Sequence, residues 1–393
     1  MYSFKELLNS KEISREAGAF YTVAEIYQQP AVWKKTAGLL IKNTEGMIKF
    51  LIDAEILNNH NAVIYITGAG SSEFVGNAVA PFLQKELACT VISVSTTDFI
   101  TQPENYLLPG KKILVISLGR SGNSPESIAT FEKTSDFSED VSQLVVTCNK
   151  EGKLAELARL DSRSYSVILP EETNDVSLVM TSSYSSMALS MLYLAYFNKR
   201  DDFLKLTDLV SQSAEYILGN WADCVKNFIT KDTQRIQYLG TCELKGAANE
   251  SWLKVLEMTD GQVVSMFNSY LGLRHGPQVF ADKTSLVIAF ISSDDYRRRY
   301  EIELLQEMQN KEQAQDYLFV CQNPNDRIKA LQGQVLEVLP VGSEVIPEAF
   351  RVLSDTVVGQ LNGVFKSLQL NLKPDNPSIS GVINRVVSGV TIY

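Results

Sequence analysis

One segment of the sequence combines two carboxylates and a lysine at helical spacing. Residues 246–258 predict a helix, and Glu250, Lys254 and Glu257 share one face of it because they are four and three residues apart. A carboxylate in such a group can move a proton, and a lysine beside it can stabilise a developing oxyanion. The alternative is an ordinary solvated face on which Glu250 and Lys254 form an ion pair, and this spacing alone leaves both interpretations open.

The chain has only two histidines, and their settings differ. His275 stands in Arg-His-Gly-Pro, directly before a rigid turn, which favours a role in proton transfer. His60 lies in Asn-His-Asn before an apolar run, and we interpret it as structural. So few histidines argue against a zinc site built on histidine ligands, and the sequence predicts neither a metal nor a cofactor.

A loop rich in serine and glycine could bind an anion. It reads Leu-Gly-Arg-Ser-Gly-Asn-Ser-Pro-Glu-Ser over residues 118–127, between a predicted strand and a predicted helix. Ser124 suits the N-cap and Pro125 the first helical position, so free N–H groups and the helix dipole point into the turn. These features favour a phosphate monoester, and the plain alternative is that Ser124 only caps its helix.

A second turn, Gly-Ala-Gly-Ser-Ser at residues 68–72, follows another predicted strand. It lacks the third glycine of a dinucleotide-binding fingerprint, because Glu73 stands there. We interpret it as a tight turn that brings Ser71 or Ser72 toward the crevice outside the carboxyl ends of the strands.

Short apolar runs that alternate with helical segments must position these residues. Strands are predicted at 62–67, 90–95, 111–117, 143–147 and 165–169, and helices at 74–87, 126–133 and 153–160. This alternation predicts an α/β fold with a parallel, doubly wound sheet. Residues 1–60 have helical character, with one helix expected to end at Pro30 and a longer one to follow it.

The second half of the chain repeats the first. Residues 238–240 and 286–288 match residues 66–68 and 114–116 at an offset of 172, and residues 319–321 match 146–148 at 173. We therefore predict two copies of one α/β domain. The predicted domains are an N-terminal helical extension (1–45), a first domain with the phosphate loop (46–205) and a second domain with the Glu/His pair and a C-terminal tail (206–393).

The two copies differ at the phosphate loop. At the corresponding position the second copy reads Ile-Ser-Ser-Asp-Asp-Tyr over residues 291–296. The adjacent carboxylates of Asp294 and Asp295 would repel a phosphate. We therefore expect one phosphate site for each pair of domains.

Composition argues against several classes of function. The 393 residues carry a net charge of −10 and 45% apolar residues, which is typical of a globular protein and unlike one that binds nucleic acid or a membrane surface. Residues 176–198 are uncharged but rich in serine, so we expect a buried helix at 187–197 rather than a membrane span. The five scattered cysteines form no CxxC pair and the N-terminus lacks a signal-peptide pattern, so we expect a cytoplasmic protein.

The motifs GAGSS, SGNSPES, NESWLKVLE and RHGP together resemble those of proteins with two tandem SIS (sugar isomerase) domains. Within these, the sequence is most similar to the AgaS group of galactosamine-6-phosphate deaminases and tagatose-6-phosphate ketose/aldose isomerases. The resemblance covers about residues 45–393. It implies two flavodoxin-like domains and an enzyme that acts on a sugar phosphate.

The resemblance also implies roles for particular residues. Glu257 becomes the proton-shuttling carboxylate, with Glu250 and Lys254 as its helix partners. His275 becomes the ring-opening group, which in relatives reaches in from a neighbouring subunit, so a homodimer or higher homo-oligomer is implied. The candidate substrate- and phosphate-binding residues are Ser71, Ser72, Ser117, Arg120, Ser121, Asn123, Ser124, Val179 and Thr181.

The sequence departs from the family pattern in two places. Relatives carry a lysine in the C-terminal tail, where this chain has Ser388 or Gly389, and Arg385 or Lys373 are the candidate substitutes. Cys242 also stands where the second glycine of a turn is usual.

The expected reaction opens the ring of a hexosamine or hexose 6-phosphate and moves a proton through an enediol or enolamine. Galactosamine 6-phosphate, converted to tagatose 6-phosphate and ammonia, is the leading expectation. Galacto and gluco substrates, and deamination and plain isomerisation, stay open. The alternatives are a non-catalytic phosphosugar sensor, which would dispense with the Glu/His pair, and an aminotransferring synthase, which would need an N-terminal glutaminase cysteine.

Overall fold

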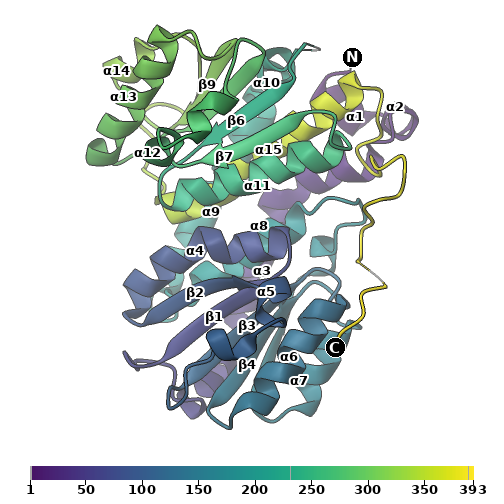
Figure 1. Cartoon of the computed structure of the whole chain (residues 1–393), viewed down its shortest axis with the longest axis vertical. Helices are drawn as coiled ribbons and strands as arrows, with labels where there is room; N and C mark the ends of the chain where they lie inside the picture. The colour runs from purple at the N-terminus through teal and green to yellow at the C-terminus, as the bar shows by residue number, and fades with distance from the viewer. Residues whose placement is uncertain (1, 231, 388) are drawn as a thin grey trace. The chain divides into compact units, whose positions relative to one another are not determined.

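The computed structural model describes residues 2–230, 232–387 and 389–393 and contains two five-stranded parallel sheets (Figure 1). The first sheet has the order β2-β1-β3-β4-β5. Its strands are β1 (Val63–Gly68), β2 (Thr90–Ser95), β3 (Ile113–Gly119), β4 (Val141–Thr147) and β5 (Ser164–Ile168). This is the flavodoxin-like order that the resemblance implies.

The second sheet has the order β10-β9-β8-β6-β7. Its strands are β6 (Arg235–Leu239), β7 (Val264–Asn268), β8 (Ser285–Phe290), β9 (Asp316–Cys321) and β10 (Gln334–Glu337). Counted from its own first strand, this sheet repeats the order of the first. The predicted internal repeat and fold class are confirmed, because the matched segments are the pairs β1 and β6, β3 and β8, and β4 and β9.

Helices connect the strands and surround the sheets. The helices of the N-terminal region and the first copy are α1 (Phe4–Asn9), α2 (Lys11–Glu16), α3 (Phe20–Asp53), α4 (Ser71–Leu87), α5 (Thr96–Phe99), α6 (Pro125–Phe137), α7 (Lys153–Leu160) and α8 (Ser182–Tyr193). Those that follow are α9 (Arg200–Asn220), α10 (Ala222–Phe228), α11 (Glu243–Met258), α12 (Tyr270–Leu273), α13 (Asp295–Asn310), α14 (Asp326–Lys329) and α15 (Glu348–Gln369). Short 3₁₀ turns occupy Pro103–Asn105, Glu171–Thr173 and Pro277–Phe280.

The chain divides into two compact units. The first-sheet unit comprises residues 31–175, 180–207 and 383–393, and the second-sheet unit comprises residues 2–30, 176–179 and 208–382. The end of the C-terminal tail therefore belongs to the first-sheet unit. The domain limits placed at residues 45 and 205 from sequence stay a prediction.

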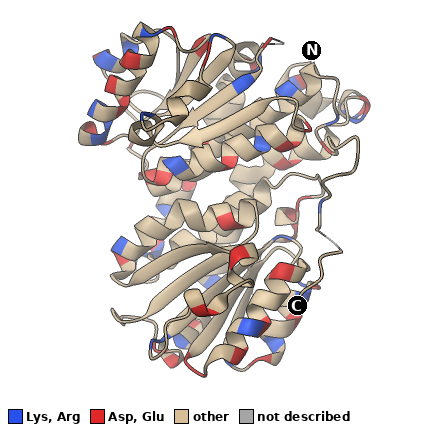
Figure 2. Ribbon diagram, viewed as in Figure 1, with Lys and Arg blue, Asp and Glu red and all other residues tan. Residues whose placement is uncertain are grey.

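The two sheets are buried and carry few charges. All residues of β1, β3, β4 and β8 are buried, as expected for parallel strands covered on both faces. Figure 2 shows that Lys, Arg, Asp and Glu gather on the helices and loops and are sparse on the strands. Every residue of α8 is buried, which confirms a buried helix here, although it begins at Ser182 and ends at Tyr193 rather than spanning 187–197. No described helix is long and apolar enough to cross a membrane.

The expected break at Pro30 is wrong, because α3 runs through this proline without interruption. A proline within a helix leaves the carbonyl four residues earlier without its backbone donor. Here that carbonyl belongs to Ile26, and the side-chain amide of Gln29 donates a hydrogen bond to it at 3.1 Å. Gln29 is itself buried and its Nε2 also donates to the side-chain oxygen of Gln360 at 2.7 Å, so packing of this helix outweighs the local preference.

The turns after β1 and β6 share one backbone conformation. Gly70 has φ 57° and ψ −129°, and Cys242, at the corresponding place in the second copy, has φ 49° and ψ −121°. Glycine adopts such angles without cost, whereas any residue with a Cβ is strained there. The departure at Cys242 therefore leaves the turn unchanged and adds strain.

We expect a Cys242→Gly variant to be more stable than the parent protein by about 1 kcal/mol, because released strain exceeds the added entropy of the unfolded chain. The reciprocal variant Gly70→Ala is expected to lose about 1–3 kcal/mol, since open space around Gly70 leaves backbone strain as the cost. Urea unfolding of both variants measures these changes. A Cys242→Gly variant that is no more stable than the parent would contradict the assignment of strain.

Candidate functional site

The loop after β3 borders a cavity of about 200 Å³ within the first-sheet unit. Its position at the carboxyl end of a parallel strand is where ligands bind in doubly wound sheets. The polar and charged residues of its lining are Ser72, Thr97, Arg120, Ser121, Ser124, Glu126, Ser127 and Arg385. Four of the predicted binding residues, Ser72, Arg120, Ser121 and Ser124, are therefore brought together.

The other predicted residues of this region lie outside the cavity lining. Ser71 and Ser117 are buried and do not line it. Asn123 is exposed, and its Oδ1 accepts a hydrogen bond from the Lys153 amide at 2.9 Å. Asn123 thus fixes the loop to the start of α7, which is a supporting role.

Sequence reasoning missed Glu126, which lies two residues beyond the N-cap of α6. Ser124 caps α6 as expected, with its Oγ accepting from the Ser127 amide at 3.4 Å. The Ser124 hydroxyl donates to Glu126 Oε2 at 2.7 Å, and the Glu126 side chain is buried and lines the cavity. A bound phosphate would have to take this hydroxyl from Glu126. The only signal in the sequence is a glutamate in the first turn, which is also ordinary helix chemistry.

The C-terminal tail forms part of the same cavity. Arg385, Val386 and Val387 line it, and the Arg120 guanidinium donates to the Arg385 carbonyl at 2.6 Å. Arg385 is held in turn by hydrogen bonds to the Asp175 carbonyl at 2.7 Å and to Asn174 Oδ1 at 2.6 Å.

Of the two candidate substitutes for the relatives' tail lysine, Arg385 is the one at the cavity. Lys373 instead belongs to the second-sheet unit, where its side chain packs over Gly18. Gly389 is exposed, and Ser388 lies outside the described residues.

Val179 and Thr181, predicted to contact substrate, are both fully buried. The Thr181 amide and hydroxyl donate to the Asp175 carboxylate at 2.8 and 3.1 Å, so this hydroxyl already has a protein partner. The Val179 carbonyl accepts from the Ser177 hydroxyl at 3.2 Å. Their contact with substrate stays a prediction.

Helix α11 places the two carboxylates and the lysine on one face, as the spacing predicts. Lys254 Nζ lies 3.1 Å from Glu250 Oε1 and 2.8 Å from Glu257 Oε2. The side chains of Glu250 and Lys254 are fully buried, whereas that of Glu257 is 23% exposed. This face is therefore largely interior, and of the three side chains only that of Glu257 is partly exposed to solvent.

Helix α15 packs closely against α11 at glycine positions, along the side of α11 that carries Ser251 and Met258. A Cβ on Gly359 would lie 2.2 Å from Ser251 Oγ, and one on Gly363 would lie 2.9 Å from the Lys254 carbonyl oxygen. Only glycine allows the two helices to approach so closely. Burial by itself would lower the pKa of Lys254, but its two carboxylate partners outweigh burial and raise that pKa above the usual value.

His275 follows α12 in the rigid turn that the sequence predicts. Gly276 has φ 118°, and Pro277 begins the 3₁₀ turn that follows. His275 is exposed, and its ring makes no hydrogen bond to any described residue of this chain. Leu271 and Val279, on either side of it in sequence, are 47% and 86% exposed.

Comparisons with known proteins give a consistent result. The sequence profile of the SIS domain matches residues 56–197. The chain is 36% identical to the D-galactosamine-6-phosphate deaminase AgaS of Shewanella sp. (strain ANA-3), over 98% of this chain and 95% of that protein. It is also 36% identical to AgaS of Escherichia coli O157:H7, over 95% of both chains.

Solved structures agree with the sequence comparisons. The tagatose-6-phosphate ketose/aldose isomerase of Escherichia coli matches with a TM-score of 0.85 and 33% identity, over 95% of this chain and 96% of that one. A structure from Clostridium novyi NT matches with a TM-score of 0.93 and 33% identity, over 100% of this chain and 99% of that one. The resemblance inferred from the motifs is confirmed. The chain belongs to the AgaS family of SIS-domain sugar-phosphate enzymes.

Proposed function

We propose that this protein converts galactosamine 6-phosphate and water to tagatose 6-phosphate and ammonia. The observation that carries the proposal is the partly exposed Glu257 carboxylate, which is held by an ion pair with the buried Lys254 on α11. The same chain also has a serine loop suited to phosphate. The names of its AgaS relatives support the choice of substrate and reaction.

The loop after β3 holds the phosphate group in this proposal. Ser121 and Ser124 supply hydroxyl donors, the dipole at the start of α6 favours negative charge, and Arg120 supplies positive charge. Arg120 is tied to the tail through the Arg385 carbonyl, so phosphate binding and the position of the tail are coupled. Ser72, at the start of α4, is a further donor at the same cavity.

Glu257 moves the proton in the chemical step. After ring opening, it removes the proton on C2, alpha to the aldehyde, and a proton is delivered to C1. The resulting ketimine at C2 takes up water and releases ammonia, which leaves the ketose phosphate. Lys254 fixes the orientation of Glu257 and supplies fixed positive charge beside it, so the developing negative charge meets a preorganised partner.

We further propose that His275 opens the sugar ring and acts from a second copy of this chain. Its exposure, and the exposed apolar side chains of Leu271 and Val279 that flank it, support a role at a contact between subunits. An imidazole can pass a proton between the ring oxygen and O1 near neutral pH.

A panel of substrates tests the proposal. Galactosamine 6-phosphate, glucosamine 6-phosphate, N-acetylgalactosamine 6-phosphate, tagatose 6-phosphate and unphosphorylated galactosamine are assayed in parallel for ammonia and for interconversion of ketose and aldose. Ammonia from galactosamine 6-phosphate and none from galactosamine is expected, because the phosphate is the group that the serine loop holds. Interconversion of ketose and aldose phosphates without ammonia would overturn the deaminase assignment, and no turnover of any compound would overturn catalysis itself.

A further inference from the structure

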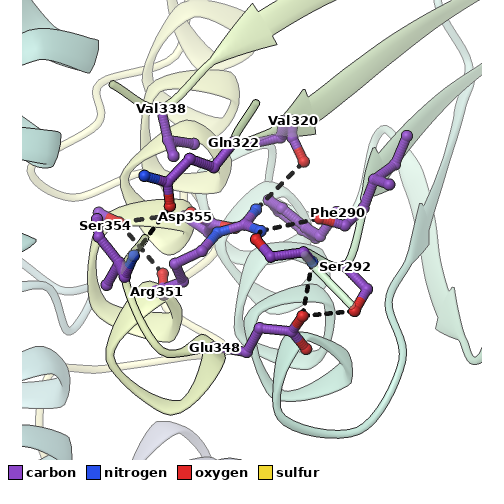
Figure 3. A network of polar contacts seen from close by, with 12 residues as sticks. Phe290, Ser292, Val320, Gln322, Val338, Glu348, Arg351, Ser354 and Asp355 are labelled. Carbon is purple, nitrogen blue, oxygen red and sulfur yellow. Dashed lines mark hydrogen bonds and ion pairs between the residues drawn. The ribbon is translucent and has the colours of Figure 1, made fainter. Parts of the chain in front are cut away.

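The loop after β8 in the second copy already holds a carboxylate from its own chain (Figure 3). Glu348, the first residue of α15, accepts a hydrogen bond from the Ser292 hydroxyl and another from the Ser293 amide at 2.7 Å, both on Oε1. Its Oε2 forms an ion pair with Arg297 Nη1 at 2.9 Å. A hydroxyl, a backbone amide and a guanidinium thus converge on one buried anionic group.

This loop is the counterpart of the phosphate loop of the first copy. Each follows the third strand of its sheet and leads into a helix with a capping side chain, Ser124 for α6 and Asp294 for α13. In the first copy, hydroxyls face a cavity. In the second copy, the same kind of donor set is taken up by Glu348.

The surroundings of Glu348 combine groups that favour an anion with a second buried carboxyl, that of Glu301, whose pKa is raised to about 7 by burial and, to a smaller extent, by Glu348. The side chain is 6% exposed and lies in the first turn of α15, where the helix dipole favours an anion. Arg351 shapes the loop by donating to the Ile291 carbonyl at 2.8 Å and is itself paired with Asp355 at 2.7 Å. Arg351 and Asp355 are fully buried, so their ion pair holds the Arg351 side chain that contacts the loop.

The sequence suggested that Asp294 and Asp295 would repel a phosphate from this loop, but neither carboxylate occupies the position among the loop donors. Asp294 is committed as the N-cap of α13 and accepts from the Arg297 amide at 2.9 Å. Asp295 is exposed. Two buried carboxylates lie among the loop donors: Glu348, more than fifty residues further along the chain, and Glu301 on α13, which accepts from the Ser292 amide at 2.9 Å.

We infer that the loop after β8 is a second oxyanion-binding site, that Glu348 keeps it closed, and that removal of this carboxylate opens it to inorganic phosphate or sulfate. A tetrahedral oxyanion would accept the same donors from Ser292, Ser293 and Arg297. The inference does not depend on the proposed activity, because it concerns only donors within the second-sheet unit.

Calorimetric titration of a Glu348→Ala variant with inorganic phosphate tests the inference. We expect one more phosphate per chain than the parent protein binds, whether the parent binds one at the serine loop or none. A Glu348→Gln variant is the matched control, because its side chain still fills the loop and should leave the phosphate count unchanged. Glu344→Ala, at an exposed position of the preceding segment, controls for loss of a carboxylate alone.

The same variants keep the test decisive if Glu348→Ala is unstable in chloride. At roughly 10 mM phosphate or sulfate, a bound anion should raise the melting temperature of Glu348→Ala well beyond its effect on Glu348→Gln or the parent. Folding only in phosphate or sulfate would support the site. A folded Glu348→Ala with an unchanged phosphate count, or an unfolded one that neither anion rescues, would overturn the inference.

Discussion

A Glu257→Gln variant is expected to lose roughly 10³-fold or more in kcat for ammonia release, because an amide cannot take up the C2 proton. Its side-chain oxygen can still accept a hydrogen bond from Lys254, so the fold and the affinity for sugar phosphate should change little. Steady-state assays give kcat, and calorimetry with galactosamine 6-phosphate gives the dissociation constant of the inactive variant. Retention of most of the rate would show that another group is the base.

Glu243→Gln is the matched control on the same helix. Glu243 lies in the first turn of α11, outside the group around Lys254, and its side chain is 18% exposed, close to the value for Glu257. An equal loss in both variants would mean that the charge of the helix, rather than the position of Glu257, controls the rate.

Mixing two inactive variants tests whether His275 serves a neighbouring subunit. If Glu257→Gln and His275→Ala chains exchange in a dimer, each mixed dimer contains one site with both native groups. About a quarter of the parent activity should then return, since half of the dimers are mixed at random exchange and half of their sites are intact. No recovery after proven exchange would place His275 and Glu257 of one chain in one site.

A Lys254→Met variant is expected to lose about 3–5 kcal/mol of stability at neutral pH, because it removes the cation from a buried ion pair. Glu250 is fully buried and would lose the partner that lies 3.1 Å away. Methionine replaces much of the lysine stem, so the loss reports charge more than packing. Urea unfolding across a range of pH measures the effect.

The pH dependence gives this prediction its sign. In the parent protein the pKa of Lys254 is raised, so its contribution is fully present at pH 7 and is lost only as the pH rises through the folded-state pKa. In Lys254→Met, Glu250 stays buried without its cation, so the loss of stability relative to the parent protein should shrink as the pH falls and the carboxyl takes up a proton.

A second variant separates charge from packing. Glu250→Gln combined with Lys254→Met removes both buried charges and should regain much of the lost stability. A double variant as unstable as Lys254→Met would show that the lysine acts through packing. A Lys254→Met variant with the same free energy of unfolding as the parent protein would contradict a stabilising role for the buried ion pair.

The fold was accessible from the sequence because its strongest signals are local. Buried parallel strands read as short apolar runs, and β2 and α7 have the predicted limits, Thr90–Ser95 and Lys153–Leu160. The repeat was visible because two copies of one unit keep the same order of strands and helices. The continuity of α3 through Pro30 was not accessible, because it depends on Gln29 and its distant partner Gln360.

The candidate site was predictable in its residue types and less so in its surroundings. The spacing of Glu250, Lys254 and Glu257 gave one helix face, but the burial of Glu250 and Lys254 depends on tertiary packing that the spacing does not reveal. The contact of Arg120 with the Arg385 carbonyl joins residues 265 positions apart, and no local sequence pattern predicts it. The hydrogen bond between Glu348 and the loop after β8 also joins residues far apart in sequence, so local patterns do not predict it.

The burial of Lys254 also determines how dissolved ions act on this protein. Because the Lys254 side chain is fully buried, its ammonium group is out of reach of mobile counter-ions. Screening by salt is weak for buried pairs and strong for charges at the surface. The field that Lys254 exerts on Glu257 is thus nearly independent of ionic strength, whereas the attraction between solvent-facing groups and an arriving phosphate is not. In the proposed reaction, changes in salt concentration are therefore expected to alter capture of the substrate and to leave the proton transfer by Glu257 largely unchanged.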